Sequence, residues 1–352
     1  MTIIEEIKKK LKENQVLFVS NGKMDYHIPG SLAEKSYSFI RPILDQNFRF
    51  YDGSDTGPKA YGYQIFLRMI NETFIHNKDS KEIAKFKYII YFDEDCFIPR
   101  LDLLYKEFEE FKISGKAFAG IPDGGMVCHR NHNNFAINTF LTFFNVEVLY
   151  NTLLKFGALD IKTGSISPRT RFEIDRMSFE ALCNKTSYNH LSAIKSDSNE
   201  CLTFCQKLRL KEVPYTETVK NDPNNPVEPN QVPYSCKLDD MEPYYKLFFY
   251  FMSLGLKPKY LLGSDFYKDE NGTIVDDMGG ITSVIYSSVE MVPLCYHTWF
   301  ARDYAPKWFF EQVEAGSDPH MPEHTYNWMK EHSERIDKVF EYCKSISDID
   351  IK

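Results

Sequence analysis

The sequence lacks the long hydrophobic segments that would indicate a membrane protein or a secreted precursor. No run of about eighteen apolar residues occurs, and the longest candidate, Tyr244 to Leu256, is too short to cross a bilayer. The N-terminal stretch MTIIEEIKKKLKENQ has no long apolar centre and no cleavage site, which is typical of an amphipathic helix rather than a signal peptide. We therefore expect a soluble, cytoplasmic protein with no integral membrane segment.

Cysteine pairs at metal-binding or redox spacing are also missing. The eight cysteines stand at positions 96, 128, 183, 201, 205, 236, 295 and 343, and no two of them form a CxxC pair. Cys201 and Cys205 are four apart, but no second pair at zinc-finger spacing accompanies them. The sequence therefore indicates reduced, mostly buried thiols in a cytosolic protein.

Several common catalytic motifs do not occur. We find no Walker loop, no GxGxxG dinucleotide fingerprint, no GxSxG elbow and no kinase HRD or DFG motif. The net charge of −8 argues against nucleic-acid binding by global attraction, although a local basic groove is compatible with it. With 43% hydrophobic residues, the 352-residue chain is long enough for a sizeable core.

The chain does alternate short apolar strands with amphipathic helices along its first third. Strands are expected at 16–19, 48–51, 88–92 and 117–121, and helices at 2–13, 33–44, 59–76 and 101–111. This alternation predicts an α/β fold with a mostly parallel central sheet flanked by helices. Because ligands bind beyond the carboxyl ends of such strands, the turns SNG, DGSDTG and DEDC are expected to converge on one crevice.

The later part of the chain is less regular. We expect a strand and a helix within 135–156, a helix that ends at Gly255, and a short strand at 290–300 that leads to His297. Residues 221–233 are rich in Asn and Pro and are expected to form a loop. The segment 306–347 is expected to be helical.

An acidic triplet follows the apolar run Tyr88–Phe92. Asp93 and Asp95 are expected on one side of the chain, where they could bind Mg²⁺ or Mn²⁺, because these ions prefer carboxylate oxygens. Glu94 would lie on the opposite side and orient the loop. An acidic turn, or a helix cap formed by Asp95, is the alternative interpretation.

The segment FYDGSDTG follows the preceding strand. Asp52 stands at its end, and Gly53 permits a close approach of the backbone to a ligand, while free N–H groups at the next helix start favour phosphate. An ordinary strand–helix turn is the alternative here.

Three segments, FRFYDGSDTG, YIIYFDEDCFI and KLDDMEPYYKLFFYFMSLGLKPKYL, together resemble the nucleotide-sugar-dependent glycosyltransferases with the A-type fold, a group that includes family 2. The second segment is similar to the DxD motif of that family. The resemblance implies that Asp93 and Asp95 hold Mn²⁺ or Mg²⁺ on the diphosphate of a nucleotide sugar, with UDP-sugar as the favoured donor. It also implies that Asp52 and Gly53 contact the nucleoside.

The same resemblance implies roles for residues elsewhere in the chain. His297 would be a further metal ligand, and Arg302 would help to balance phosphate charge, although a backbone-bonded His and a surface Arg are the ordinary alternatives. The segment PDGGMVCHRNHNN would face the donor sugar and the acceptor, or else form a solvated loop. Its implied substrate-binding residues are Asp123, Gly124, Gly125, His129 and His132.

An inverting transferase also needs a carboxylate that deprotonates the acceptor hydroxyl. The family carries this acid in an x-Glu-Asp triplet about a dozen residues before a glycine, and here that place holds Met241, Glu242 and Pro243. Asp240 or Glu242 is the expected base. Alternatively, these acids cap the helix that follows.

The resulting prediction is a metal-dependent glycosyltransferase. Residues 1–122 would form a nucleotide-sugar-binding half, 123–300 an acceptor-binding half, and 301–352 a helical C-terminal extension. The acceptor hydroxyl would belong to a glycan, a lipid-linked sugar or a small molecule. The alternatives are a phage- or viral-type glycosyltransferase acting on hydroxylated DNA bases, a nucleotidyltransferase, for which VSNGKMDYH offers Lys23 but a single glycine, and a non-enzymatic binding module.

Overall fold

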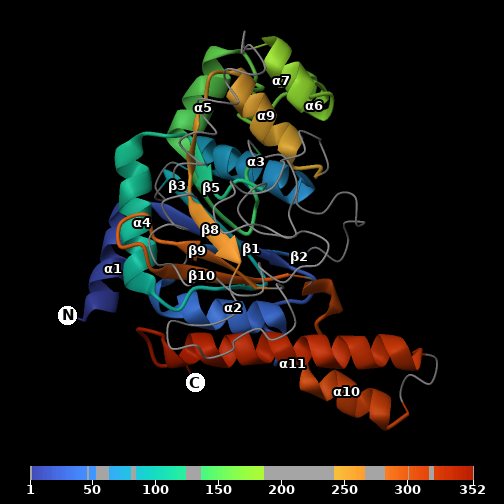
Figure 1. The fold of residues 1–352 in the computed structure, drawn as a ribbon. Helices are drawn as coiled ribbons and strands as arrows, with labels where there is room; N and C mark the ends of the chain where they lie inside the picture. The colour runs from blue at the N-terminus through green and yellow to red at the C-terminus, as the bar shows by residue number, and fades with distance from the viewer. Residues whose placement is uncertain are drawn as a thin grey trace, which may run out of the picture.

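The structure, a computed structural model, describes residues 2–45, 47–52, 63–80, 85–123, 136–185, 242–265, 282–299, 301–316 and 321–351. These residues form a mixed α/β fold in which helices cover a six-stranded, mostly parallel sheet, and a four-stranded sheet lies beside it (Figure 1). The predicted fold class is confirmed at this level.

The large sheet has the strand order β2-β1-β3-β6-β5-β7. Its members are β1 (Val16–Gly22), β2 (Phe48–Asp52), β3 (Tyr88–Asp93), β5 (Phe118–Gly120), β6 (Leu141–Asn145) and β7 (Pro258–Tyr260). β1 runs parallel to both β2 and β3, and β5 runs parallel to β7. β6 is antiparallel to both of its neighbours, which makes the sheet mixed.

The central strands are buried on both faces. In β1, Leu17 and Val19 belong to the core on one face, whereas Val16 and Phe18 belong to the core on the other. Each of these side chains is at most 1% exposed. This double burial explains why the strand sequences are continuously apolar rather than alternating.

Helices cover the two faces of the large sheet. One face is covered by α3 (Tyr63–Asp79), α5 (Val146–Lys155), α6 (Pro168–Asp175), α7 (Phe179–Lys185) and α9 (Tyr245–Ser253). The other is covered by α1 (Ile3–Glu13), the short 3-10 helix η1 (Arg41–Ile43) and α4 (Leu101–Ser114). Local signals set several of these boundaries: Thr2 and Glu5 form a capping box at α1, and Gly255 follows α9 with a φ of 88°.

The second sheet is antiparallel throughout and has the order β4-β10-β9-β8. Its strands are β4 (Cys96–Phe97), β8 (Leu262–Asp265), β9 (Thr282–Tyr286) and β10 (Pro293–Thr298). It packs through a third core against α2 (Leu32–Ile40) and α11 (Glu323–Ser345). Among these strands the sequence predicted β10 alone.

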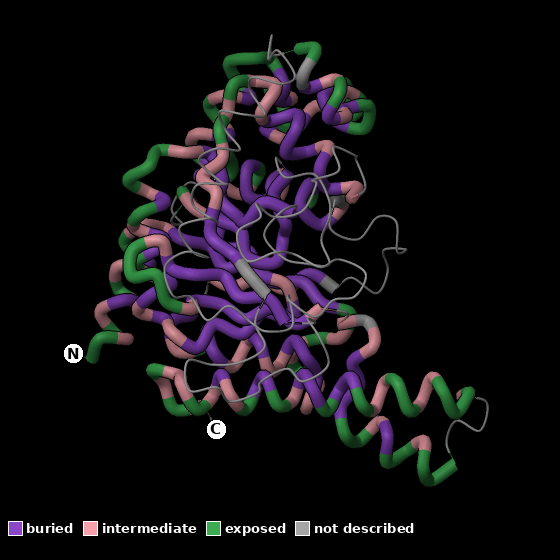
Figure 2. The backbone as a smooth tube through the Cα atoms, viewed as in Figure 1, coloured by how far each residue is buried: buried purple, intermediate pink, exposed green. Residues whose placement is uncertain are grey.

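The C-terminal part is helical, as predicted. The 3-10 helix η3 (Ala301–Asp303), α10 (Lys307–Glu314) and α11 follow β10, and α10 and α11 lie together at one end of the molecule (Figure 1). Figure 2 shows that their outer sides are exposed while the central strands are buried. The division of the chain at residues 122 and 300 stays a prediction.

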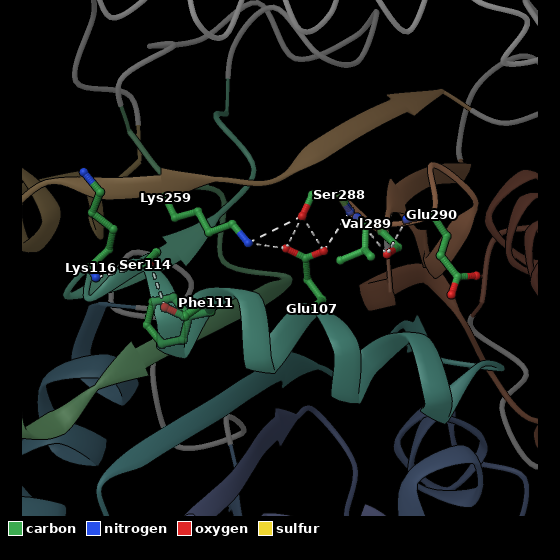
Figure 3. Close-up of polar contacts among 9 residues, drawn as sticks. Glu107, Phe111, Ser114, Lys116, Lys259, Ser288, Val289 and Glu290 are labelled. Carbon is green, nitrogen blue, oxygen red and sulfur yellow. Dashed lines mark hydrogen bonds and ion pairs between the residues drawn. The ribbon is translucent and has the colours of Figure 1, made fainter. Parts of the chain in front are cut away.

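A buried carboxylate joins the two sheets. Glu107 on α4 is completely buried, and its Oε1 lies 2.7 Å from Lys259 Nζ on β7. Its Oε2 accepts the backbone N–H of Ser288, just after β9, at 2.7 Å, and the Ser288 hydroxyl lies 2.8 Å from both carboxylate oxygens (Figure 3). The contact therefore connects α4, the large sheet and the turn that leads to β10.

The structure also bears on the expected absence of a membrane span and on the expected burial of the cysteines, in both cases for the described residues. None of their helices is both long enough and apolar enough to span a bilayer. Among the described residues, Cys96, Cys295 and Cys343 form no disulfide and are buried, which agrees with the predicted burial of the thiols.

Candidate functional site

The carboxyl ends of three neighbouring strands meet at one edge of the large sheet. Gly22 of β1 is in register with Asp52 of β2, and Asn21 is in register with Asp93 of β3. The predicted convergence of these strand ends is therefore confirmed for the backbone. Residues 53–62, which include Gly53, lie outside the described part of the chain, as does the side chain of Asp52.

Asp93 belongs to a polar cluster at the end of β3. The hydroxyl of Tyr91, two residues earlier on the same side of the strand, donates to Asp93 Oδ1 and also reaches Asn21 Oδ1. Burial, together with the negative charge of Asp95, raises the pKa of Asp93 well above its usual value. The sheet thus presents a partly buried carboxyl group at the edge where its parallel strands end.

Glu94 points to the turn that follows β1. Its Oε2 accepts the backbone N–H of Lys23 at 2.8 Å, which agrees with the prediction that Glu94 orients the loop. Burial, and then the charge of Asp95, raises the pKa of Glu94 to about 8. A Cβ at Gly22 would lie 2.5 Å from this carboxylate oxygen, so the absence of a side chain at position 22 allows the contact.

Asp95 and His297 are brought together by the small sheet. Cys96 of β4 is in register with His297 of β10, and the N–H of Thr298 donates to the carbonyl oxygen of Asp95 at 3.0 Å. As a result, Asp95 Oδ1 lies 3.2 Å from His297 Nε2, and both residues are at least nine-tenths buried. Donor atoms of Asp95, Cys96 and His297 all lie within 4.8 Å of one another.

Two atoms of this group have unmet hydrogen-bonding capacity. Among the described residues, Asp95 Oδ1 and His297 Nδ1 are buried and have no hydrogen-bond partner; the 3.2 Å contact of Asp95 Oδ1 is with His297 Nε2 and is not a hydrogen bond. Leaving such a group unsatisfied costs about 1–3 kcal/mol, and more when it is charged. A divalent cation beside Asp95 would supply a partner and would offset the charge of the acidic triplet. The donor set therefore fits a metal ion.

The composition of this group differs from the sequence prediction. The side-chain alternation assumed for Asp93 and Asp95 does not apply, because β3 ends at Asp93 and residues 94–95 form a turn. The three side chains whose donor atoms lie close enough to share a metal ion include Cys96 and not Asp93. The role of Asp93 as a metal ligand stays a prediction. Sequence reasoning missed Cys96, and the only available signal was its position directly after Asp95.

Asp123 is fully enclosed in a second polar network. It is 1% exposed; its Oδ1 accepts from Asn138 Nδ2 at 2.6 Å, and its Oδ2 accepts from the hydroxyls of Tyr244, at 3.1 Å, and Tyr245. These contacts tie the segment after β5 to the start of α9. The predicted contact between Asp123 and the donor sugar stays a prediction.

Glu242 lies just before α9, three residues from Tyr245. Its carbonyl oxygen accepts the N–H of Tyr245 at 3.1 Å, and the side chain of the N-cap residue Tyr244 makes no capping hydrogen bond. The alternative in which the acids before α9 cap this helix stays a prediction. Several other predicted site residues lie outside the described part of the chain: Asp240, Gly124, Gly125, His129, His132 and the side chain of Arg302.

Comparisons with known proteins add little. No protein-family model matches the chain, and no curated protein matches it. Among solved structures, the crystal structure of A197 from STIV matches with a TM-score of 0.27 and 12% identity, covering 43% of this chain and 74% of that one. So low a TM-score supports no conclusion about either fold or function.

Proposed function

We propose that this protein is a metal-dependent glycosyltransferase that moves a sugar from a nucleotide diphosphate donor to a hydroxyl acceptor. The observation that carries the proposal is the buried pair Asp95 and His297, which lies where the strand ends of the large sheet meet the small sheet. Open α/β sheets bind their ligands at this edge. The proposal also rests on the sequence resemblance of the DEDC segment to a DxD motif.

Asp95 and His297 would hold the cation through one oxygen and one nitrogen. A divalent ion bound there would supply Lewis-acid stabilisation of the diphosphate leaving group. Asp93, which accepts from Tyr91 beside Asn21, would ionise only with the ion nearby, because its raised pKa favours the neutral acid without one. Asp52, next to Gly22 at the same edge, is the proposed contact to the nucleoside.

The acceptor would bind on the side of the edge that leads to α9. Glu242, or Asp240 before it, would take the proton from the acceptor hydroxyl if the reaction inverts configuration. The network around Asp123 would then have a positioning role, because Tyr244 and Tyr245 fix the first turn of α9 directly after Glu242. The proposed acceptor is a glycan, a lipid-linked sugar or a small hydroxyl compound.

Ligand-induced thermal stabilisation tests this proposal directly. The full-length chain would be heated with UDP, GDP and CMP, each with Mn²⁺, Mg²⁺ or Co²⁺ and each with EDTA instead. We expect stabilisation by a nucleoside diphosphate that requires the metal, of about 2.7 kcal/mol at a ligand concentration of 100 times Kd. Release of the nucleotide from the matching nucleotide sugar would then be measured with candidate acceptors.

A pair of Asp→Asn variants gives the control. Asp95→Asn should lose the metal-dependent stabilisation. Asp160→Asn, in the turn after α5 where Asp160 caps the N–H of Lys162, should keep it. The proposal would be overturned if no nucleoside diphosphate stabilises the wild-type chain with any of the metals, or if Asp95→Asn responds as the wild type does.

A further inference from the structure

Cys96 is brought beside Asp95 and His297 by the pairing of two short strands. Because Cys96 and His297 are opposite each other in the β4–β10 ladder, the thiol lies beside the imidazole and the carboxylate of Asp95. All three side chains are buried, and Asp95 Oδ1 and His297 Nδ1 are the atoms of this group that have no hydrogen-bond partner. The group thus offers one oxygen, one nitrogen and one sulfur to the same point.

We infer that Cys96, as a thiolate, is the third protein ligand of the cation held by Asp95 and His297, and that the site therefore takes Zn²⁺ or Co²⁺ in preference to Mg²⁺ or Mn²⁺. Thiolate and imidazole favour zinc-like ions, whereas Mg²⁺ and Mn²⁺ favour sets made of oxygen alone. This inference deepens the proposed function, since it concerns the metal of the same site.

Burial, and then the neighbouring Cys295, raises the pKa of the Cys96 thiol well above its usual value, so the charge of a bound ion would be needed to displace its proton. Cys96 Sγ donates to the carbonyl oxygen of Phe140 at 2.9 Å, and this oxygen also accepts the backbone N–H of Asp93 at 3.0 Å. When the thiol proton leaves, the carbonyl therefore keeps a partner, and the sulfur is free to bind the ion. Metal binding at such a site releases a proton and weakens as the pH falls.

The geometry of the other two ligands is compatible with a tetrahedral ion. Two donors about 2.1 Å from such an ion lie about 3.4 Å apart, and Asp95 Oδ1 lies 3.2 Å from His297 Nε2. Three protein ligands leave a fourth position open, as in catalytic zinc sites. The proposed function implies that a diphosphate oxygen fills this fourth position. The set of three protein ligands does not depend on the proposed function.

The ring of Phe140 helps to fix the imidazole. It stacks on His297 with ring centroids 4.2 Å apart, and Trp299 contacts the same imidazole edge-on at 4.3 Å. These contacts hold the His297 ring beside Asp95 before any ion binds.

Cobalt spectroscopy on the full-length chain tests the inference. Co²⁺ would be titrated into metal-free protein, and thiolate-to-cobalt charge-transfer absorption in the near ultraviolet would be recorded, followed by displacement with Zn²⁺, Mn²⁺ or Mg²⁺. We expect the charge-transfer band in the wild type, its removal by Zn²⁺, and its persistence with equimolar Mn²⁺ or Mg²⁺.

Two serine variants complete the test. Cys96→Ser should lose the charge-transfer band and weaken Co²⁺ and Zn²⁺ binding at least roughly 10-fold, a loss seen even when an outer-shell partner is removed. Cys343→Ser, equally buried but on α11 and outside the group, should keep both. Circular dichroism would establish that both variants are folded.

The inference would be overturned if the wild type binds no Co²⁺, if it binds Co²⁺ without a charge-transfer band, or if Cys96→Ser retains the band. The first two outcomes are decided on the wild type alone, so they hold even if Cys96→Ser does not fold. If UDP with Mn²⁺ stabilises the protein while no thiolate band forms, the proposed transferase stands and the role of Cys96 fails. A thiolate band without any nucleotide effect would instead uphold the metal site and overturn the transferase.

Discussion

Removal of the Glu107 carboxylate should destabilise the protein strongly, because it leaves a charged partner without its buried counter-charge. Glu107 is completely buried, and Lys259, whose side chain is 18% exposed, is its ion-pair partner. In Glu107→Ala the ammonium loses this partner, and the N–H and hydroxyl of Ser288 lose their acceptor. Breaking a buried pair from one side costs roughly 3–5 kcal/mol in the free energy of unfolding.

Two further substitutions separate charge from shape. Glu107→Gln retains the size of the side chain and one carbonyl acceptor, so its expected cost is about 1.5–3 kcal/mol, the value of hydrogen bonds to a charged group. Lys259→Met leaves the carboxylate buried beside Ser288 alone and should cost as much as Glu107→Ala. The double variant Glu107→Gln, Lys259→Met should be more stable than the sum of the two single effects predicts, because neither charge is left alone.

Urea unfolding followed by circular dichroism measures these differences. Glu110→Ala, on the exposed side of the same helix, is the matched control and should lie within about 0.5 kcal/mol of the wild type. The reasoning is refuted if Glu107→Ala and Glu110→Ala are equally stable, or if the Glu107 and Lys259 effects simply add. Because the contact holds the turn before β10, Glu107→Gln should also weaken Co²⁺ binding at His297.

Three further changes test local features of the fold. Gly120→Ala places a Cβ 2.3 Å from Ile137 Cγ2 and should cost about 1–3 kcal/mol through overpacking, which a urea midpoint close to that of the wild type would disprove. Gly115→Ala meets no atom within 4 Å but has a φ of 63°, so strain alone should cost about 1 kcal/mol; equal stability of the two proteins would contradict this. Asp123→Asn keeps the shape of the buried side chain but replaces one carboxylate oxygen with an NH₂ donor that faces Tyr245. We expect the free energy of unfolding, measured by heat or urea, to fall by about 1–3 kcal/mol. An unchanged stability would show that the network is not needed.

Local sequence signals predicted the large sheet well. The apolar runs that became β1 and β3 were recognised because burial on both faces requires continuous hydrophobicity. Gly255 was correctly expected to end a helix, since its φ of 88° suits glycine. The strands β4, β7, β8 and β9 were missed, because they are short or paired with distant segments and carry little periodic signal of their own.

For the candidate site, the sequence indicated which residue types could bind a metal ion, but not which of these residues lie together in space. The acidic triplet, its place after a buried strand and the later His297 were all visible in the linear chain, and each residue type limits what can bind. The tertiary structure decided which donor side chains lie together. The register of β4 with β10 places Cys96 opposite His297, although about two hundred residues of chain separate them. The turn at residues 94–95 then separates Asp93 from these side chains, and an alternation rule for extended strands does not anticipate this. Hydrophobic pattern thus determined the sheet and its carboxyl edge, whereas long-range strand pairing decided which side chains meet there.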